Sequence, residues 1–165
     1  MSSGLMVGAS GAIYSVADLD VMAERIASSG LFPGVDTKQA AFTLMLLCQS
    51  EGLHPAQAMK RYHIIDGRPT MRADAMQATF QAAGGRIQWI RSDSDVCEAV
   101  FAHPEHAPEG VPVRVTFDEL DQAGVTRSKY GVKDNWRRFP RQMLRARAIS
   151  EGVRMVLPGV VVGIY

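Results

Sequence analysis

The stretch "NWRRFPRQMLRARAISEGVR", residues 135–154, carries six arginines and a single acid, Glu151, in twenty positions. It predicts one helix on which apolar residues fill the arcs between the arginines: Met143, Leu144, Ala148, Val153 and Val156. An exposed helix normally alternates basic with acidic residues, because i,i+4 ion pairs stabilise it. Since acids are almost absent here, the arginines are predicted to bind a partner rather than neighbouring carboxylates.

The arginines of this stretch form two predicted clusters. At about 100° per residue, Arg138, Arg141 and Arg145 lie on one side of the helix, and Arg147 and Arg154 lie on the other. Fourteen of the eighteen basic residues in the chain are arginines, whose planar guanidinium makes forked contacts with phosphate. The sequence therefore predicts a helix that follows the phosphate backbone of a nucleic acid.

Two aromatic residues, Trp136 and Phe139, lie in the same basic run, beside Arg137. Aromatic rings next to cations are typical of proteins that bind single strands, because the bases stack on the rings. Base stacking is therefore a second prediction for this run. The plainer interpretation, a solvated surface face, stays open.

Length and composition predict one globular domain. The chain has 165 residues, with 47% hydrophobic and 21% charged residues, which are ordinary globular values. The net charge of +1 hides a local charge of +6 − 1 = +5 in residues 137–154, so the remainder carries about −4. No signal peptide or membrane span is recognisable. Cys48 and Cys97 lie in apolar patterns and are predicted to be reduced core thiols of a cytoplasmic protein, although one disulfide stays open.

The order of elements predicts an α+β fold, with helices packed on a small, mostly antiparallel sheet. Residues 1–14 are predicted to be a flexible arm and residues 15–165 a single domain. Capping and breaker residues delimit helices over 15–30 and 37–51, and Pro55 restarts a helix. Asp66-Gly67 predicts a hairpin with Pro69 on an edge strand. The later elements are a helix over 72–85, a three-strand meander over 86–92, 96–103 and 112–117, and a short helix over 116–124.

Catalytic and metal-binding motifs are weak. His103 and His106, in "HPEH", lie among prolines and predict a surface loop, and a zinc site needs more ligands than these two imidazoles and the nearby Cys97. His63 is predicted to be structural, with Asp66 a turn former. No phosphate-binding loop, nucleophile elbow or dinucleotide fingerprint is present. No catalytic residue and no cofactor are therefore expected.

The run "W-x-x-F-P-R-Q-M-L-R-x-R-A-I-S-E-x-V-R", followed by "GIY", resembles the C-terminal core signature of the RecT and Red beta phage recombinases. "CQSEGLHP", the hairpin, the helix ending in "GG" and the meander agree with that family's order, so the resemblance covers about residues 40–165. It implies an ATP-independent protein that anneals single-stranded DNA to its complementary strand through a duplex intermediate. It also implies a large homo-oligomer, ring or helical filament, in the cytoplasm of a bacterial host.

The resemblance also implies which residues contact DNA. The family's cationic contacts correspond to Arg141, Arg147 and Arg154, with Arg145 as a neighbour. The adjoining candidates are Arg137, Arg138, Trp136 and the hairpin cations Lys60, Arg61, Arg68 and Arg72. The chain departs from Red beta in having arginine where that protein has mostly lysine, and in its shorter hairpin loop. Family members continue past "GIY" into a partner-binding region, through which a phage exonuclease or a host single-strand-binding protein would bind. The resemblance leads us to expect that this chain lacks that region.

Two other functions stay open. One is a metal-dependent nuclease that uses His103, His106 and nearby acids. The other is a phage structural or interaction protein whose arginines bind an acidic protein partner. In the annealing interpretation, the apolar helices from Ser15 to Glu51 are predicted to supply contacts between subunits.

Overall fold

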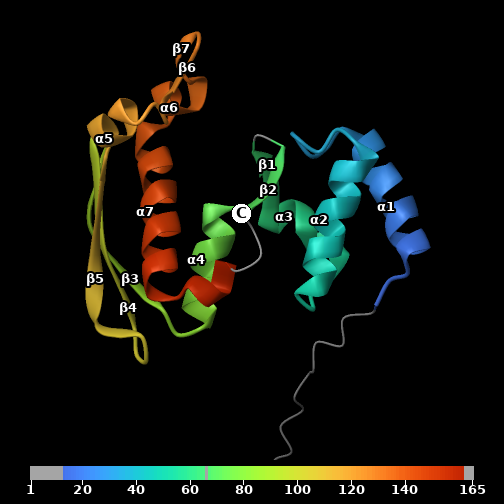
Figure 1. The fold of residues 1–165 in the computed structure, drawn as a ribbon, viewed down its shortest axis with the longest axis horizontal. Helices are drawn as coiled ribbons and strands as arrows, with labels where there is room; N and C mark the ends of the chain where they lie inside the picture. The colour runs from blue at the N-terminus through green and yellow to red at the C-terminus, as the bar shows by residue number, and fades with distance from the viewer. Residues whose placement is uncertain (1–12, 66, 162–165) are drawn as a thin grey trace, which may run out of the picture. The chain divides into compact units, whose positions relative to one another are not determined.

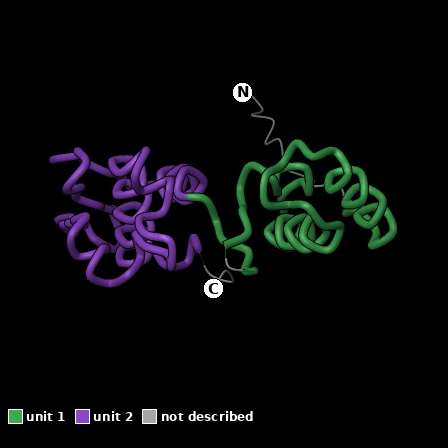
Figure 2. The backbone as a smooth tube through the Cα atoms, turned by 90° about the horizontal axis from the view of Figure 1, so that it is seen from above, with its two compact units in different colours: residues 1–72, 164–165 green, residues 73–163 purple. Residues whose placement is uncertain are grey.

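The computed structural model describes residues 13–65 and 67–161, and their fold is α+β, as predicted. Backbone contacts divide the chain into two compact units, with the boundary between Arg72 and Ala73 (Figure 2). The sequence predicts one domain over 15–165, whereas each unit of the structure has its own set of packed elements. No helix within the described residues is long and apolar enough to cross a membrane.

Unit 1 begins with two helices that pack side by side (Figure 1). Ser15 and Asp18 form a capping box at the start of the first helix, and Gly30, with a φ of 64°, ends it as predicted. Thr37 caps the second helix through the backbone N–H of Ala40. Cys48 is one of the buried residues between them. The two helices are α1 (Val16–Ser29) and α2 (Lys38–Ser50).

Tyr14 is attached to α2, although the sequence assigns it to a flexible arm. Its backbone N–H donates to Oε1 of Gln49 over 2.9 Å, and Nε2 of Gln49 donates back to the Tyr14 carbonyl over 3.1 Å. The Tyr14 hydroxyl lies 2.6 Å from Nε2 of His54. Residues 1–12 of the predicted arm lie outside the described residues.

The predicted hairpin completes unit 1. Its strands pair antiparallel, with Tyr62 opposite Met71, and Gly67 has the positive φ of 75° that the turn requires. Tyr62 is buried, and its hydroxyl donates to Glu51, which also pairs with Arg61. Burial and this carboxylate raise the pKa of Tyr62. The elements are η1 (Pro55–Gln57), α3 (Ala58–Arg61), β1 (Tyr62–Ile65) and β2 (Arg68–Met71).

Unit 2 is built on the predicted meander, an antiparallel sheet in the order β3-β4-β5. Its inward face buries Cys97, Ala99 and Phe101 of the central strand. Both cysteines of the chain are buried free thiols, which confirms their prediction as core residues. The elements are α4 (Ala73–Ala82), β3 (Arg86–Ser92), β4 (Val96–His103) and β5 (Ala107–Thr116).

The segment "PEHAPEGV" is predicted as a loop, and most of that prediction is wrong. β5 begins at Ala107, directly opposite His103, so the turn spans only residues 104–106. The pairing then shifts before Val111 meets Phe101, and Gly110 adopts a φ of 80° within this irregularity. Such a bulge lets proline enter a strand, because the local ladder there does not need its missing N–H.

One long helix covers the inward face of this sheet and also packs on α4 (Figure 1). This helix, α7, buries Leu144, Ala148 and Val153, while Phe101 packs against the rings of Phe80 and Trp89 at 6.0 and 6.4 Å. The remaining elements are α5 (Phe117–Gln122), β6 (Arg127–Ser128), β7 (Gly131–Val132), α6 (Asp134–Arg138), α7 (Pro140–Val156) and η2 (Pro158–Val161).

The single basic helix over residues 135–154 is a wrong prediction. The chain leaves helical geometry at Phe139, with φ −135° and ψ 50°, so α6 and α7 are separate helices. Pro140 is the physical cause, because its ring disfavours the helical conformation of the preceding residue while suiting the first position of a new helix. Arg137 and Arg138 therefore belong to α6, and the predicted cluster of Arg138 with Arg141 and Arg145 does not lie on one helix.

Candidate nucleic-acid interface

The four arginines of α7, called here the α7 arginines, are Arg141, Arg145, Arg147 and Arg154. Within the described residues, none of them has a carboxylate within ion-pairing distance. Many cations elsewhere do have one: Lys38, Arg61, Arg91, Arg114, Arg127, Arg137 and Arg138. α7 is therefore the helix on which positive charge is concentrated without compensation.

The α7 arginines lie on two sides of the helix. At about 100° per residue, Arg147 and Arg154 fall about 20° apart, on the side opposite the buried residues of α7. Arg141 and Arg145 fall about 40° apart, on the same side as those buried residues. The guanidinium of Arg145 lies over the ring of Trp89 on β3, 4.3 Å from its centroid. Arg154 donates to the carbonyl of Ser150 over 3.1 Å and to its hydroxyl. The four charges thus do not share a single face.

Trp136 does not have the position that base stacking requires. Its side chain is only 2% exposed and packs edge-on against Phe117, with centroids 6.0 Å apart. The prediction of Trp136 as a stacking residue is therefore corrected: it is a core residue that anchors α6. Phe139, at the break between the two helices, has a ring that is 49% exposed and is therefore accessible for stacking.

The structure exposes a further group of basic and aromatic side chains, which we call the tip: Lys129, Tyr130, Arg137, Arg138 and Phe139. Arg137, Arg138 and Phe139 are among the contacts predicted from the sequence, whereas Lys129 and Tyr130 are not. Tyr130, in the turn between β6 and β7, is 86% exposed, and Nζ of Lys129 lies 4.8 Å from its ring centroid. Arg138 lies in the same way 5.4 Å from the ring of Phe139. The signal in the sequence is a lone tyrosine among cations in "TRSKYGVKD", residues 126–134.

Asp134 partly neutralises the tip. Its two carboxylate oxygens lie 2.5 Å from Arg137 and 3.4 Å from Arg138. Both arginines remain largely exposed, so these are surface ion pairs, which contribute about 0–1 kcal/mol each. A polyanion can therefore compete with Asp134 for them.

The β6–β7 turn is held by Asp121, the last acid of α5. Arg127 donates to both oxygens of Asp121 over 2.7 and 2.6 Å, and the buried hydroxyl of Thr126 donates to one of them. Lys133, just after β7, donates to the carbonyl of Val125 over 2.9 Å. The hydrogen bonds from Arg127 and Thr126 lower the pKa of Asp121 to about 2.

Replacing Asp121 with asparagine is expected to lower the thermal midpoint in a pH-dependent way. Because the pKa of Asp121 is about 2 in the fold and 3.8 ordinarily, its charge stabilises the fold above about pH 4, and this contribution is lost as the pH falls toward 2. The difference in midpoint between wild type and Asp121→Asn should therefore be largest near pH 5 and shrink toward pH 2. A difference that stays constant over this range would contradict the role of the charge. Glu109→Gln on β5 is the control, and its difference should be small throughout.

The hairpin cations of unit 1 are not equivalent. Arg61 pairs with Glu51 over 3.1 Å and is largely buried, so it belongs to the internal network with Tyr62. Lys60 and Arg68 are exposed and have no ion pair with any described residue. Of the four predicted hairpin cations, Lys60, Arg68 and Arg72 are exposed and Arg61 is not.

The prediction that His103 lies in a surface loop is wrong. His103 lies at the buried end of β4. Its Nε2 donates to the carbonyl of Ala83 over 2.9 Å, and its Nδ1 accepts the backbone N–H of Glu105 over 3.2 Å. The ring of His106 lies beside it, at 4.8 Å. Since both nitrogens of His103 are bound to backbone, neither is offered to a metal. No group of three or more potential metal ligands occurs in the part of the chain that the structure describes.

The candidate interface thus consists of the α7 arginines and the tip, both in unit 2. Lys60 and Arg68 are separate candidate cations of unit 1. The likeness to RecT and Red beta proteins rests on the sequence signature and order of elements given above. Comparison of the chain with protein-family models, curated proteins and solved structures finds no match.

Proposed function

We propose that this protein binds single-stranded DNA by its phosphate backbone and anneals it to a complementary strand, without nucleotide hydrolysis, as a homo-oligomer. One observation above all supports the proposal: four arginines on one helix have no carboxylate partner among the described residues, while many cations elsewhere do. Cations held without counter-charge are suited to a polyanion, since phosphate binding releases the counterions condensed on the strand.

The physical basis of annealing would be charge neutralisation. Two complementary strands repel each other through their phosphates, and this repulsion falls when protein cations neutralise one backbone. Phosphate contacts leave the base edges available for pairing. Because no covalent bond forms or breaks, neither a catalytic residue nor ATP is required.

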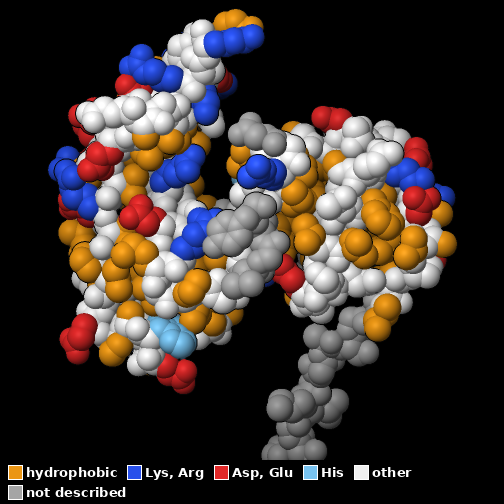
Figure 3. All heavy atoms as spheres, viewed as in Figure 1, with side chains coloured by type: hydrophobic (Ala, Val, Ile, Leu, Met, Phe, Trp, Pro, Cys, Tyr) orange, Lys and Arg blue, Asp and Glu red, His pale blue; other side chains and the backbone are white. Residues whose placement is uncertain are grey.

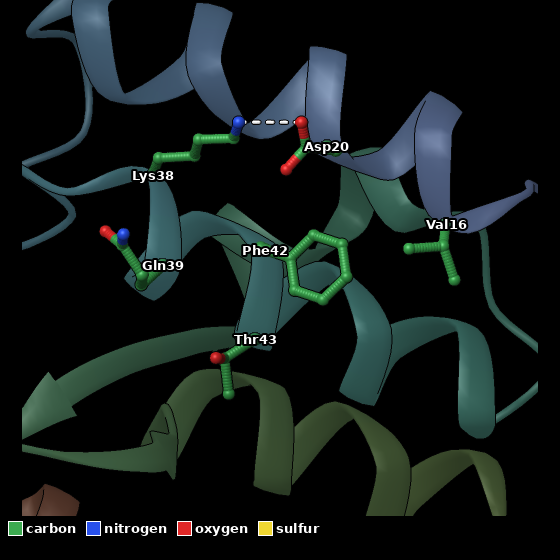
Figure 4. Close-up of a pocket in the computed structure, with 6 residues that line it drawn as sticks. All are labelled: Val16, Asp20, Lys38, Gln39, Phe42 and Thr43. Carbon is green, nitrogen blue, oxygen red and sulfur yellow. Dashed lines mark hydrogen bonds and ion pairs between the residues drawn. The ribbon is translucent and has the colours of Figure 1, made fainter.

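The helix pair of unit 1 supports a role in subunit contact. Its exposed apolar side chains are Val16, Val21 and Leu46, and Leu31 is exposed in the connection between the helices. Figure 4 shows a surface pocket between α1 and α2 in which Phe42 lies near Val16, bordered by the ion pair of Lys38 with Asp20 at 2.6 Å. Apolar surface of this kind is typical of protein–protein contacts. A cytoplasmic location, and a phage exonuclease or host single-strand-binding protein as partner, belong to the same proposal.

The test mixes the protein with one oligonucleotide and then with its complement, in a buffer that contains EDTA and no ATP. Fluorescence energy transfer between labelled strands should rise much faster than without protein, and sedimentation should show assemblies that grow when the second strand is added. A protein that sediments as a monomer under all these conditions would contradict the proposal. Strict dependence on ATP would contradict it as well.

A further inference from the structure

The tip exposes two aromatic rings. Tyr130 extends from the turn between β6 and β7, 86% exposed, and Phe139 lies at the break between α6 and α7, 49% exposed. Figure 3 shows hydrophobic side chains together with Lys and Arg side chains at this end of unit 2. Each ring has a cation over it: Lys129 at 4.8 Å and Arg138 at 5.4 Å.

This combination matches the two parts of a nucleotide. A ring with a cation beside it can stack on a base while the cation contacts the neighbouring phosphate. An acidic protein segment would use the cations but would have no need of two exposed rings. The chemistry of the tip therefore favours an unpaired nucleotide over an acidic peptide.

The tip is also held in place before any ligand binds. The bidentate pair of Arg127 with Asp121 and the hydrogen bond from Lys133 to Val125 fix both ends of the β6–β7 turn. Phe139 is fixed by its position between the buried Trp136 and the start of α7. A preorganised surface loses less conformational entropy on binding than a flexible one.

We propose that Tyr130 and Phe139 stack on unpaired bases of the bound strand, with Lys129 and Arg138 on the adjoining phosphates. The inference rests on the proposed function and assigns it a second contact, to bases rather than to the backbone. Bases in a finished duplex are stacked on one another, so this contact is available only before pairing. The tip therefore makes the protein favour a single strand over a duplex of the same length.

The experiment measures fluorescence anisotropy with two labelled probes of equal length, oligo-dT and an oligonucleotide in which abasic sites replace the bases. Tyr130→Ala and Phe139→Ala should each weaken oligo-dT binding about fivefold or more, the value of one lost stack. Binding of the abasic probe should change little, and the slope of log affinity against log salt should stay that of wild type. Tyr130→Phe, which keeps the ring, should bind as wild type does.

Ile90→Ala is the matched control, since Ile90 is an exposed apolar residue of unit 2 on β3. Circular dichroism should be unchanged for all these variants, because none removes a buried side chain. Equal weakening for both probes would overturn the stacking role. Smaller assemblies with unchanged preference for oligo-dT would also overturn it, because the tip would then be a contact with a second copy of the chain.

The outcomes separate this inference from the proposed function. If wild type binds oligo-dT with a steep salt dependence and the ring variants bind equally well, the stacking role fails and the function of the α7 arginines stands. If wild type binds neither probe, the proposed function fails, and the stacking role fails with it.

Discussion

Replacing Gly152 with alanine is expected to destabilise the protein by about 1–3 kcal/mol, the usual cost of inserting atoms into a packed core. A β-carbon at this position would lie 2.3–2.5 Å from ring atoms of Phe101, far inside van der Waals contact. Phe101 is fully buried between Phe80 and Trp89 and has little room to move. Alanine has the better helix propensity, by about 1 kcal/mol, and this opposes the cost. A net loss of stability in Gly152→Ala would therefore be due to the close contact with Phe101.

Urea unfolding followed by circular dichroism would measure the change. Gly159→Ala is the control, because nothing lies within 4 Å of a β-carbon there, and its stability should stay within about 0.5 kcal/mol of wild type. The double variant Gly152→Ala with Phe101→Leu should be more stable than the sum of the two single changes predicts, since the smaller side chain makes room. A Gly152→Ala protein as stable as wild type would show that the helix does not approach the strand so closely.

The contact at Gly152 connects packing to the candidate interface. Because Gly152 has no side chain, α7 can lie directly on the ring of Phe101 in the middle of the sheet. The same packing brings Arg145, two turns earlier, over Trp89, and leaves Arg147 on the opposite, solvent side. The positions of the α7 arginines therefore depend on a residue that carries no charge.

Features encoded by local chemistry were predictable from the sequence. The capping box of Ser15 with Asp18, the positive φ of Gly30 and the turn at Gly67 each depend on neighbouring residues only. The meander was predictable because sequential strands joined by short connections usually pair. These signals establish the α+β class and the order of the elements.

Features that depend on tertiary packing were not predictable in the same way. Trp136 and Phe139 are both aromatic residues in one basic run, yet one is buried against Phe117 and the other exposed. Pro140 is the signal for the break between α6 and α7, but the residues on either side of it have a helical pattern, which predicts a continuous helix. The burial of His103 depends on the carbonyl of Ala83, twenty residues away, and no sequence pattern reveals such a partner.

Changing Arg141, Arg147 and Arg154 together to alanine is expected to weaken binding of single-stranded DNA. If the variant and wild type bind equally at 1 M salt, the variant should bind about 100-fold more weakly than wild type at 0.1 M. Each lost phosphate contact reduces the slope of log affinity against log salt by about 0.7, so three contacts reduce it by about 2. Arg145 is left in place because it covers Trp89, and its removal would mix a change of packing with a change of charge. Oligonucleotides of different sequence should all be weakened alike, since phosphate contacts carry no base readout.

The three changes should leave the fold intact. Alanine is the best helix former, and none of these arginines has a carboxylate partner among the described residues that would be left uncompensated. Circular dichroism and the thermal midpoint should therefore stay near wild type. If the arginines instead formed structural ion pairs, the triple variant would lose stability and keep the salt slope of wild type.

A second triple variant separates local contact from overall charge. Arg25 on α1, Arg86 on β3 and Arg114 on β5 are exposed arginines outside α7, and their replacement by alanine changes the net charge by the same amount. If long-range attraction alone binds DNA, both triple variants should lose affinity equally. If α7 contacts the phosphates, the slope should fall by about 2 in the first variant and remain close to wild type in the second. An unchanged slope in a well-folded first variant would remove the DNA-binding role from α7.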